Sequence, residues 1–152
     1  MDAEKFTKKS LEVIESCEKL AYEYNNQELT QAHLMYALVT VEDSLIAKLL
    51  TNMGINMDAF TGECEKLVAN RPKVSGGQLF TSPEFSKALI QAEKEAKQMG
   101  DDYISVEHIF LGLLEKADKD IKRVINAYGI TRGKFLEVLA NIRGNRKVES
   151  DN

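Results

Sequence analysis

Apolar residues recur at spacings of three and four along most of the chain, the spacing of helices that bury one face. The first helix of each half of the chain has the longest such stripe. No run of β-branched residues and no hairpin dipeptide between alternating segments indicates a strand. The pattern therefore predicts an all-α fold. The stripe in the first half consists of Val13, Ile14, Cys17, Ala21 and Tyr24.

The second half of the chain repeats the first at an offset of 75 residues, the separation of His33 and His108. The two halves align without a gap. A period this long is typical of a duplicated globular unit, because solenoid repeats are shorter and more numerous. We expect eight helices, arranged as two pseudo-symmetric four-helix repeats. Identical residues at this offset include Glu18 and Glu93, Leu38 and Leu113, Gly54 and Gly129, and Phe60 and Phe135.

A segment with helix-breaking residues separates the two repeats. Repeat one is expected at about 1–70, the connection at 71–81 and repeat two at about 82–144, so that 1–144 form one domain. Pro72 and the Gly76-Gly77 pair end helical structure, and Ser82-Pro83 begins it again with a cap and a first-turn proline. Residues 145–152 have no apolar periodicity and are expected to begin a flexible linker.

The two histidines occupy the same place in each repeat. Thr30 and Ser105 stand three residues before His33 and His108, which is the spacing of a capping box with histidine in place of the usual Glu or Gln. The alternative is a split metal or catalytic pair, but a zinc site would need further ligands and neither fragment supplies them nearby. We expect caps and no metal.

A second pair of structural residues is expected at the end of the third helix of each repeat. Gly54 and Gly129 are each followed by isoleucine, and a glycine there can adopt the left-handed conformation that ends a helix.

Charge and cysteine content argue against several classes of function for the chain. The chain has 152 residues, a net charge of −4 and a sequence pI near 5.3, which argue against nucleic acid as a partner. Cys17 and Cys64 lack CxxC partners, and they align with Ala92 and Leu139, so buried thiols are expected. Charges throughout residues 1–20 indicate neither a secretion signal nor a membrane span, so a cytoplasmic location is expected.

No catalytic motif is recognisable in the sequence. The phosphate-binding GxxxxGK[ST] loop, GxSxG, HExxH and a GxGxxG after a strand are all missing from the sequence. The run AEKEAK, Ala92 to Lys97, is interpreted as a solvated helix face with Glu93 and Lys97 paired across one turn. The chain is therefore expected to be non-catalytic and to bind no cofactor of its own.

Three stretches of the chain resemble the Clp N-terminal domain family, and within it most closely the ClpB disaggregase type. They are FTKKS at Phe6–Ser10, AEKEAKQMGDDYISVEHIFLGLLE at Ala92–Glu115 and IRGNRKV at Ile142–Val148. The resemblance implies a monomeric module that captures unfolded or aggregated proteins for a hexameric ring. The ring's ATPase modules, which bind ATP and Mg, lie outside this chain.

The same resemblance places residues that handle substrate at Thr7, Asp101 and Glu107. Thr7 could equally start a helix, Asp101 form a turn, and Glu107 favour the helix dipole. We also expect a cleft where the two halves meet, with Leu79 and Phe80 of the connection at it. The alternative for these two is that they only dock the connection onto the core.

A second family role is kept as an alternative. In the ClpA and ClpC types, the resemblance implies docking of an adaptor protein, and a co-chaperone or adaptor is therefore a further candidate partner.

The ClpC type also has a glutamate in each repeat for recognising phosphorylated arginine. Here Glu107 is present but Ala32 stands at the first position. This favours the ClpB type and argues against recognition of phosphorylated arginine.

Overall fold

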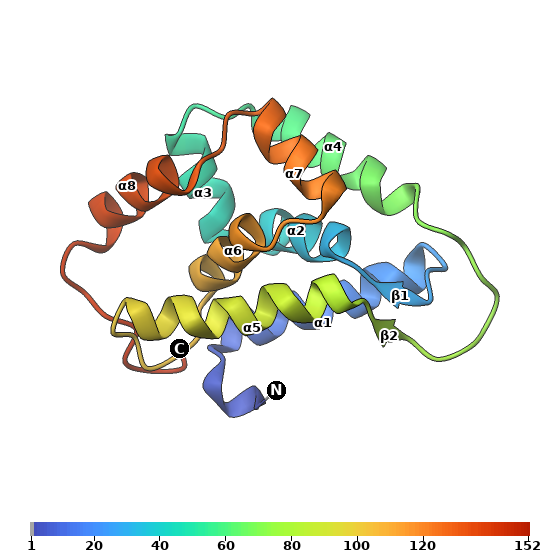
Figure 1. Cartoon of the computed structure of the whole chain (residues 1–152), viewed down its shortest axis with the longest axis horizontal. Helices are drawn as coiled ribbons and strands as arrows, with labels where there is room; N and C mark the ends of the chain where they lie inside the picture. The colour runs from blue at the N-terminus through green and yellow to red at the C-terminus, as the bar shows by residue number, and fades with distance from the viewer. Residues whose placement is uncertain (1) are drawn as a thin grey trace.

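A computed structural model describes residues 2–152, and these residues form eight α-helices and a short 3₁₀ helix (Figure 1). The expected all-α fold of eight helices is confirmed. The 3₁₀ helix is Ala3–Lys5, and the α-helices are α1 (Lys8–Glu23), α2 (Gln31–Thr40), α3 (Leu45–Asn52), α4 (Met57–Ala69), α5 (Pro83–Gln98), α6 (Val106–Glu115), α7 (Lys119–Ala127) and α8 (Arg132–Arg143).

Polar caps and glycines set the ends of the helices. Ser82, for example, accepts a hydrogen bond from the Phe85 N–H at 3.0 Å, with Pro83 in the first turn of α5. The third helix of each repeat is followed by a glycine in the left-handed region, Gly54 at φ 84° and Gly129 at φ 67°. Most helix ends therefore follow from local sequence signals.

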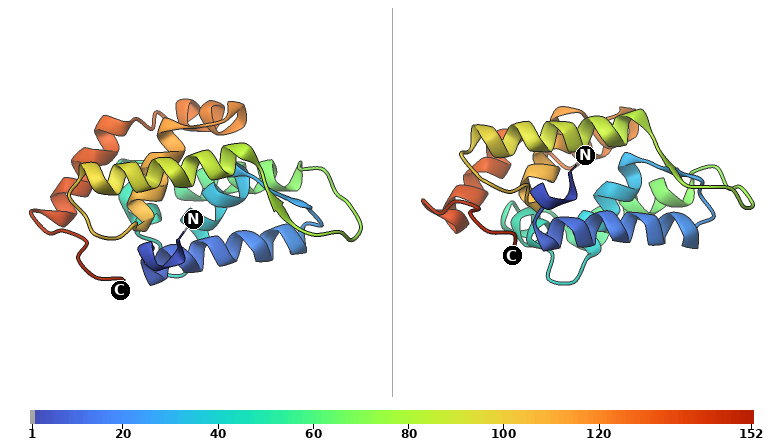
Figure 2. Two further views of the ribbon diagram at one scale, coloured as in Figure 1. Left: turned by 60° about the horizontal axis from the view of Figure 1, so that its bottom comes forward. Right: turned by 90° about the horizontal axis from the view of Figure 1, so that it is seen from below.

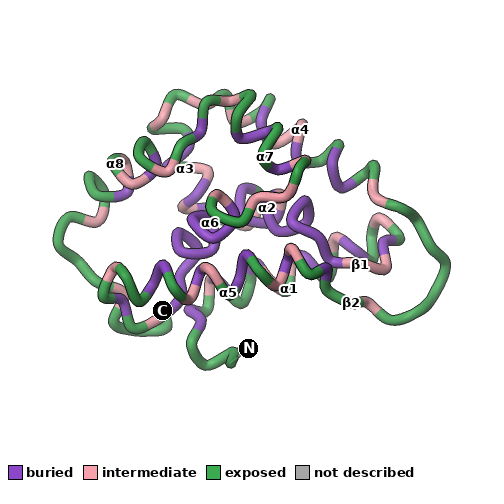
Figure 3. The backbone as a smooth tube through the Cα atoms, viewed as in Figure 1, coloured by how far each residue is buried: buried purple, intermediate pink, exposed green. Residues whose placement is uncertain are grey.

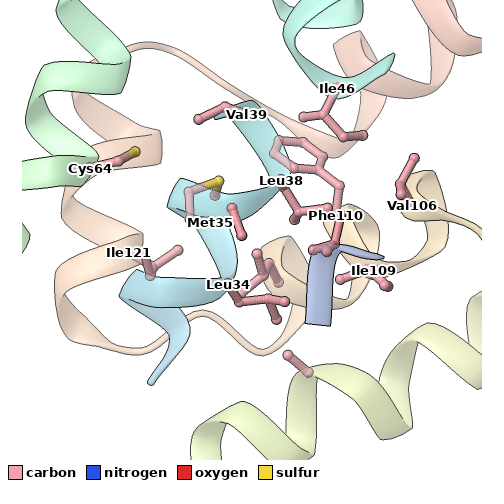
Figure 4. Packing of buried hydrophobic residues seen from close by; sticks show 14 of the residues in the cluster. Leu34, Met35, Leu38, Val39, Ile46, Cys64, Val106, Ile109, Phe110 and Ile121 are labelled. Atoms are coloured by element: carbon pink, nitrogen blue, oxygen red, sulfur yellow. The ribbon is translucent and has the colours of Figure 1, made fainter. Parts of the chain in front are cut away.

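The core is centred on α2 and α6, which lie between α1 and α5 on one side and α3, α4, α7 and α8 on the other (Figure 3). Eight of the ten residues in each of these two helices are buried. Side chains from α2, α3 and α6 meet in one cluster (Figure 4), and the rings of Phe110 and Phe135 lie 4.6 Å apart. Because both central helices are buried on nearly all sides, the two repeats share one core.

Short parallel strand pairs join the two repeats, and the sequence did not indicate them. Strand β1 (Glu28–Leu29) pairs with β2 (Phe80–Thr81), and an isolated bridge joins Phe6 to Ile104. Leu29 pairs with Thr81, and the residues at their repeat-equivalent positions, Ile104 and Phe6, also pair with each other. The extended residues just before the first helix of each repeat thus pair with the other repeat. Strands of two residues are too short to show alternation.

The prediction of a solvated face for AEKEAK is wrong in part. Glu95 is only 1% exposed, and its two carboxylate oxygens accept hydrogen bonds from Arg132 at 2.6 and 2.9 Å. Burial raises the pKa of Glu95, but the hydrogen bonds from Arg132 and Gln91 outweigh this and lower it. Glu93 pairs with Lys5 at 2.7 Å instead of with Lys97. Residues distant in the sequence therefore determine which ion pairs the acids of this helix face form.

Residues 145–152 form no helix or strand, but they hydrogen-bond to the rest of the domain. The Val148 N–H donates to Asp101 Oδ1 at 3.0 Å, and the Lys8 N–H at the start of α1 donates to the Asp151 carbonyl at 2.6 Å. The start of a linker at residue 145 stays a prediction. None of the helices within residues 2–152 has both the length and the apolar character needed to cross a membrane.

Candidate functional site

His33 lies buried at the start of α2 and uses both ring nitrogens. Its Nδ1 accepts the Thr30 N–H at 3.0 Å, so the proton lies on Nε2, which donates to Asn26 Oδ1 at 2.8 Å. Burial, and then the charge of Arg71, lower the pKa of His33 to about 4. The ring is neutral near pH 7, and neither nitrogen is free for a metal or a proton-transfer step.

His108 has the same arrangement in repeat two, with a charged partner. The Ser105 N–H donates to its Nδ1 at 2.9 Å, and its Nε2 lies 2.7 Å from Asp101 Oδ2. Burial lowers the pKa of His108, while Glu107 and Asp101 act in the opposite direction. Within residues 2–152, no group of three or more His, Cys, Asp or Glu side chains is placed to hold a metal ion.

Asp101 and Glu107 are held together by one arginine of α8. Arg143 Nη2 lies 2.8 Å from Asp101 Oδ2 and 3.2 Å from Glu107 Oε2. Only 11% of the Arg143 side chain is exposed, and both acids are buried. Burial raises the pKa of Asp101, but hydrogen bonds from the Val148 N–H, His108 and Arg143 lower it below its usual range. The cluster is an internal ion-pair network.

Repeat one has neutral residues at all three of these positions. Asn26, Ala32 and Val68 are the repeat-one equivalents of Asp101, Glu107 and Arg143, and all three are buried. The two acids and the arginine therefore occur together in one repeat and are all missing from the other. Their shared presence is what a structural network requires, since each acid needs the arginine.

Thr7 is also buried, at the start of α1. Its Oγ1 accepts a hydrogen bond from the Ser10 N–H at 3.2 Å, and the Ser10 hydroxyl donates to the Ile104 carbonyl at 2.9 Å. The Thr7 N–H itself donates to Ile104 at 3.0 Å. Thr7 thus lies beside the segment that leads into α6 and Glu107. It also caps α1, which is the helix-start role given above as the alternative to substrate handling.

Leu79 and Phe80 lie at the opposite end of the molecule from Asp101. They precede the 16-residue helix α5, whereas Asp101 follows it, and a helix of this length spans about 24 Å. Phe80 is 53% exposed at a pocket of about 210 Å³, and Leu79 is partly buried at a smaller one. The five residues expected to bind substrate therefore do not form one site.

An apolar groove of about 280 Å³ lies between α1 and α5, where the two repeats meet. The two helices run antiparallel beside each other (Figure 2). Ile14 and Leu89 occupy equivalent positions on opposite walls, so the groove lies across the pseudo-two-fold axis. The lining residues are Ala3, Phe6, Leu11, Ile14, Glu18, Leu29, Thr81, Phe85 and Leu89.

The groove agrees with the expected position between the two halves but not with the expected residues. Sequence periodicity placed Ile14 on a core stripe, and the repeat places Leu89 at the equivalent position; in the structure both line the groove as well. Leu11, which is 37% exposed, lies outside that stripe. An apolar residue one turn before Ile14 but outside the stripe was the signal that could have indicated a groove wall.

Comparison with known proteins agrees with the fold and the repeats. The family model described as the Clp repeat (R) N-terminal domain matches residues 5–128. The chaperone protein ClpB of Clostridium tetani (strain Massachusetts / E88) is 38% identical over 155 residues, which cover 99% of this chain and 18% of that protein. The chain thus spans about one fifth of the length of this relative.

Solved structures show the same fold at lower sequence identity. The N-terminal domain of Hsp104 from Candida albicans superposes with a TM-score of 0.86 at 21% identity, covering 98% of each chain. The ClpV N-domain in complex with a VipB peptide superposes with a TM-score of 0.73 at 18% identity, covering 96% of this chain and 91% of that one. Since the family model covers most of the chain, this protein belongs to the Clp repeat N-terminal domain family.

Proposed function

We propose that this domain captures apolar segments of unfolded or aggregated polypeptide for a ClpB-type disaggregase. The observation that carries the proposal is the open apolar groove between α1 and α5. In this proposal the domain is non-catalytic and cytoplasmic, and a hexameric ATPase ring, which uses ATP and Mg, does the threading. Similarity to ClpB over the whole chain supports this role.

The groove suits weak binding of many sequences. Leu11 and Ile14 on one helix face Leu89 on the other, so a client side chain meets apolar surface on both walls. Apart from Glu18, its lining side chains offer little for directional recognition, and it is open to solvent. Binding therefore gains mainly from buried apolar area, which discriminates poorly between sequences.

The five residues expected to bind substrate keep a role in the proposal, but they lie in different parts of the molecule and act in different ways. Thr7 caps α1 and thereby supports one wall of the groove, while Asp101 and Glu107 fix α6 to α8. Phe80 and Leu79 adjoin the groove through Thr81, which lines it. We propose that Phe80 extends the apolar surface available to a client.

Docking of one adaptor protein in the same groove is the second candidate function. The ClpV N-domain, which has this fold, forms a complex with a VipB peptide, and that observation favours peptide binding of some kind. The two candidates differ in selectivity. Disaggregase clients should bind with similar weak affinity whatever their sequence, whereas an adaptor segment should bind far more tightly than unrelated unfolded chains.

The first prediction tests the groove with a substitution that should not disturb the fold. Leu11→Ser removes partly exposed apolar surface from one wall and should weaken binding of a carboxymethylated, permanently unfolded protein several-fold. Chemical-shift mapping on the isolated domain should place the client at the groove. The melting temperature should change little, because Leu11 is already 37% exposed.

Tyr22→Ser is the matched control, since Tyr22 is an exposed residue of the same helix that does not line the groove. Equal weakening by both variants, or shifts confined to residues 144–152, would contradict the proposal. Tight binding of a single folded partner, with no binding of unfolded chains, would favour the adaptor role instead.

A further inference from the structure

The chain that follows each repeat binds at the same place on that repeat. In repeat one this chain is the connection, and Lys73 Nζ donates to the Tyr24 carbonyl at the end of α1 at 3.1 Å. In repeat two it is the segment 145–152, and Lys147 Nζ donates to the Met99 carbonyl at the end of α5 at 2.7 Å. Tyr24 and Met99 are equivalent positions. Each repeat therefore has a docking site for the segment that leaves it.

The two docking sites differ in one group, which is an amide in repeat one and an acid in repeat two. Asn26 and Asp101 are equivalent, and each has one side-chain oxygen beside the buried histidine of its repeat. The other end of each group faces the docked segment. Asn26 Nδ2 donates to the Pro72 carbonyl at 3.1 Å, and Asp101 Oδ1 accepts the Val148 N–H at 3.0 Å. The amide thus suits a segment that presents a carbonyl, and the acid suits one that presents an N–H.

The two docked segments also differ in how they are held. The connection is anchored by a helix at both ends, α4 and α5, whereas within residues 2–152 the segment 145–152 is anchored by a helix only at α8. Beyond Val148 it reaches the start of α1, where the Lys8 N–H donates to the Asp151 carbonyl at 2.6 Å (Figure 2). All of its residues except Val148 are exposed. Since few hydrogen bonds and little apolar area hold this segment, it can open without unfolding the domain.

We propose that residues 145–152 are a releasable strap, and that Asp101 is the latch that holds this strap on repeat two. With the strap docked, the chain leaves the domain beside the start of α1. With the strap released, residue 152 can move by up to about 28 Å, because each of the eight residues spans about 3.5 Å when extended. Asp101 thus connects the point where the chain leaves the domain to the internal network with His108 and Arg143.

Asp101→Asn tests the latch without changing the size of the side chain. His108 Nε2 donates to residue 101, so the amide oxygen of the variant should face His108, as that of Asn26 faces His33. The amide N–H group then meets the Val148 N–H, and two donors cannot bond to each other. The strap should be released while the fold is kept, because repeat one packs an asparagine beside its histidine at the equivalent position.

Two measurements on the chain 1–152 report the state of the strap. Nitrogen-15 relaxation should show an ordered backbone at residues 145–152 in the unaltered chain and a mobile one in Asp101→Asn. Cleavage by trypsin after Lys147 should become about tenfold faster, the effect of losing one hydrogen bond to a charged group. Asp102→Asn is the matched control, because it makes the same substitution on the next side chain, which is exposed, and it should change neither result.

Val148→Pro tests the same hydrogen bond from the side of the strap. It removes the N–H that Asp101 accepts and leaves the internal network unaltered, so it should release the strap whether or not Asp101→Asn also lowers the stability of the domain. A mobile segment 145–152 in the unaltered chain would overturn the inference. So would a strap that stays ordered in Val148→Pro, or equal behaviour of Asp101→Asn and Asp102→Asn. None of these results bears on the groove, which Leu11→Ser tests separately.

Discussion

The ion-pair network of Asp101, Glu107 and Arg143 shows that a residue can be required for stability only because its neighbours are charged. The internal repeat supplies a second solution at the same positions, in which Asn26, Ala32 and Val68 are buried without charge. A buried ion pair gains little over a well-packed neutral set, but removal of one partner leaves an uncompensated charge. The network should therefore be fragile to single changes and tolerant of replacement as a unit.

Arg143→Ala should accordingly lower the free energy of unfolding by about 3–5 kcal/mol, because it strands two buried carboxylates. The triple variant with the repeat-one residues, Asp101→Asn, Glu107→Ala and Arg143→Val, should be distinctly more stable than Arg143→Ala alone. Urea denaturation followed by circular dichroism measures both. A triple variant less stable than Arg143→Ala would show that the charges stabilise the fold directly.

Among the elements, α5 and α6 approach each other so closely that no Cβ fits between them at Gly112. A Cβ added at Gly112 of α6 would collide with the Ala88 carbonyl and lie 3.0 Å from the Ala92 backbone nitrogen of α5. The equivalent position in repeat one is Ala37, so α1 and α2 leave room for a methyl group that α5 and α6 do not. The groove wall in repeat two is therefore fixed by a glycine.

Gly112→Ala should destabilise the domain by about 1–3 kcal/mol, the usual cost of forcing extra volume into a packed contact. Gly62→Ala is the matched control, because it lies inside α4 with open space at its Cβ. That control should raise stability by roughly 0.5–1 kcal/mol, since alanine favours the helix more than glycine does. Thermal unfolding of both variants measures the difference, and similar losses in the two would refute the close contact.

Elements could be predicted from the sequence where local signals decide them. The stripe from Val13 to Ala21, the cap at Ser82 and the glycines at 54 and 129 each depend only on residues close by in the sequence. The strand pairs, the Glu95–Arg132 pair and the groove depend instead on which surfaces of the two repeats meet. No periodicity in one segment reports such contacts, although the repeat alignment indicated that the halves would form a junction.

For the molecule as a whole, the two repeats are not independent folding units. The extended residues just before the first helix of each repeat pair with the other repeat, Phe6 with Ile104 and Thr81 with Leu29. The central helices α2 and α6 are buried on nearly all sides, and they pack on each other within one continuous core. Separation of the repeats would expose these faces to water, at a cost that grows with the apolar area uncovered.

The whole chain should therefore unfold in a single cooperative transition, and fragments 2–70 and 82–152 should each fail to fold alone. Circular dichroism during urea denaturation should show a sigmoidal transition for the whole chain and gradual changes for each fragment. A matched control is the folded chain cut within the connection at Gly76-Gly77, where the backbone carries no helix. The two pieces should stay associated and keep their structure, because the shared core and the strand pairs hold them together. A cooperative transition in either isolated fragment would instead mean that each repeat closes its own core.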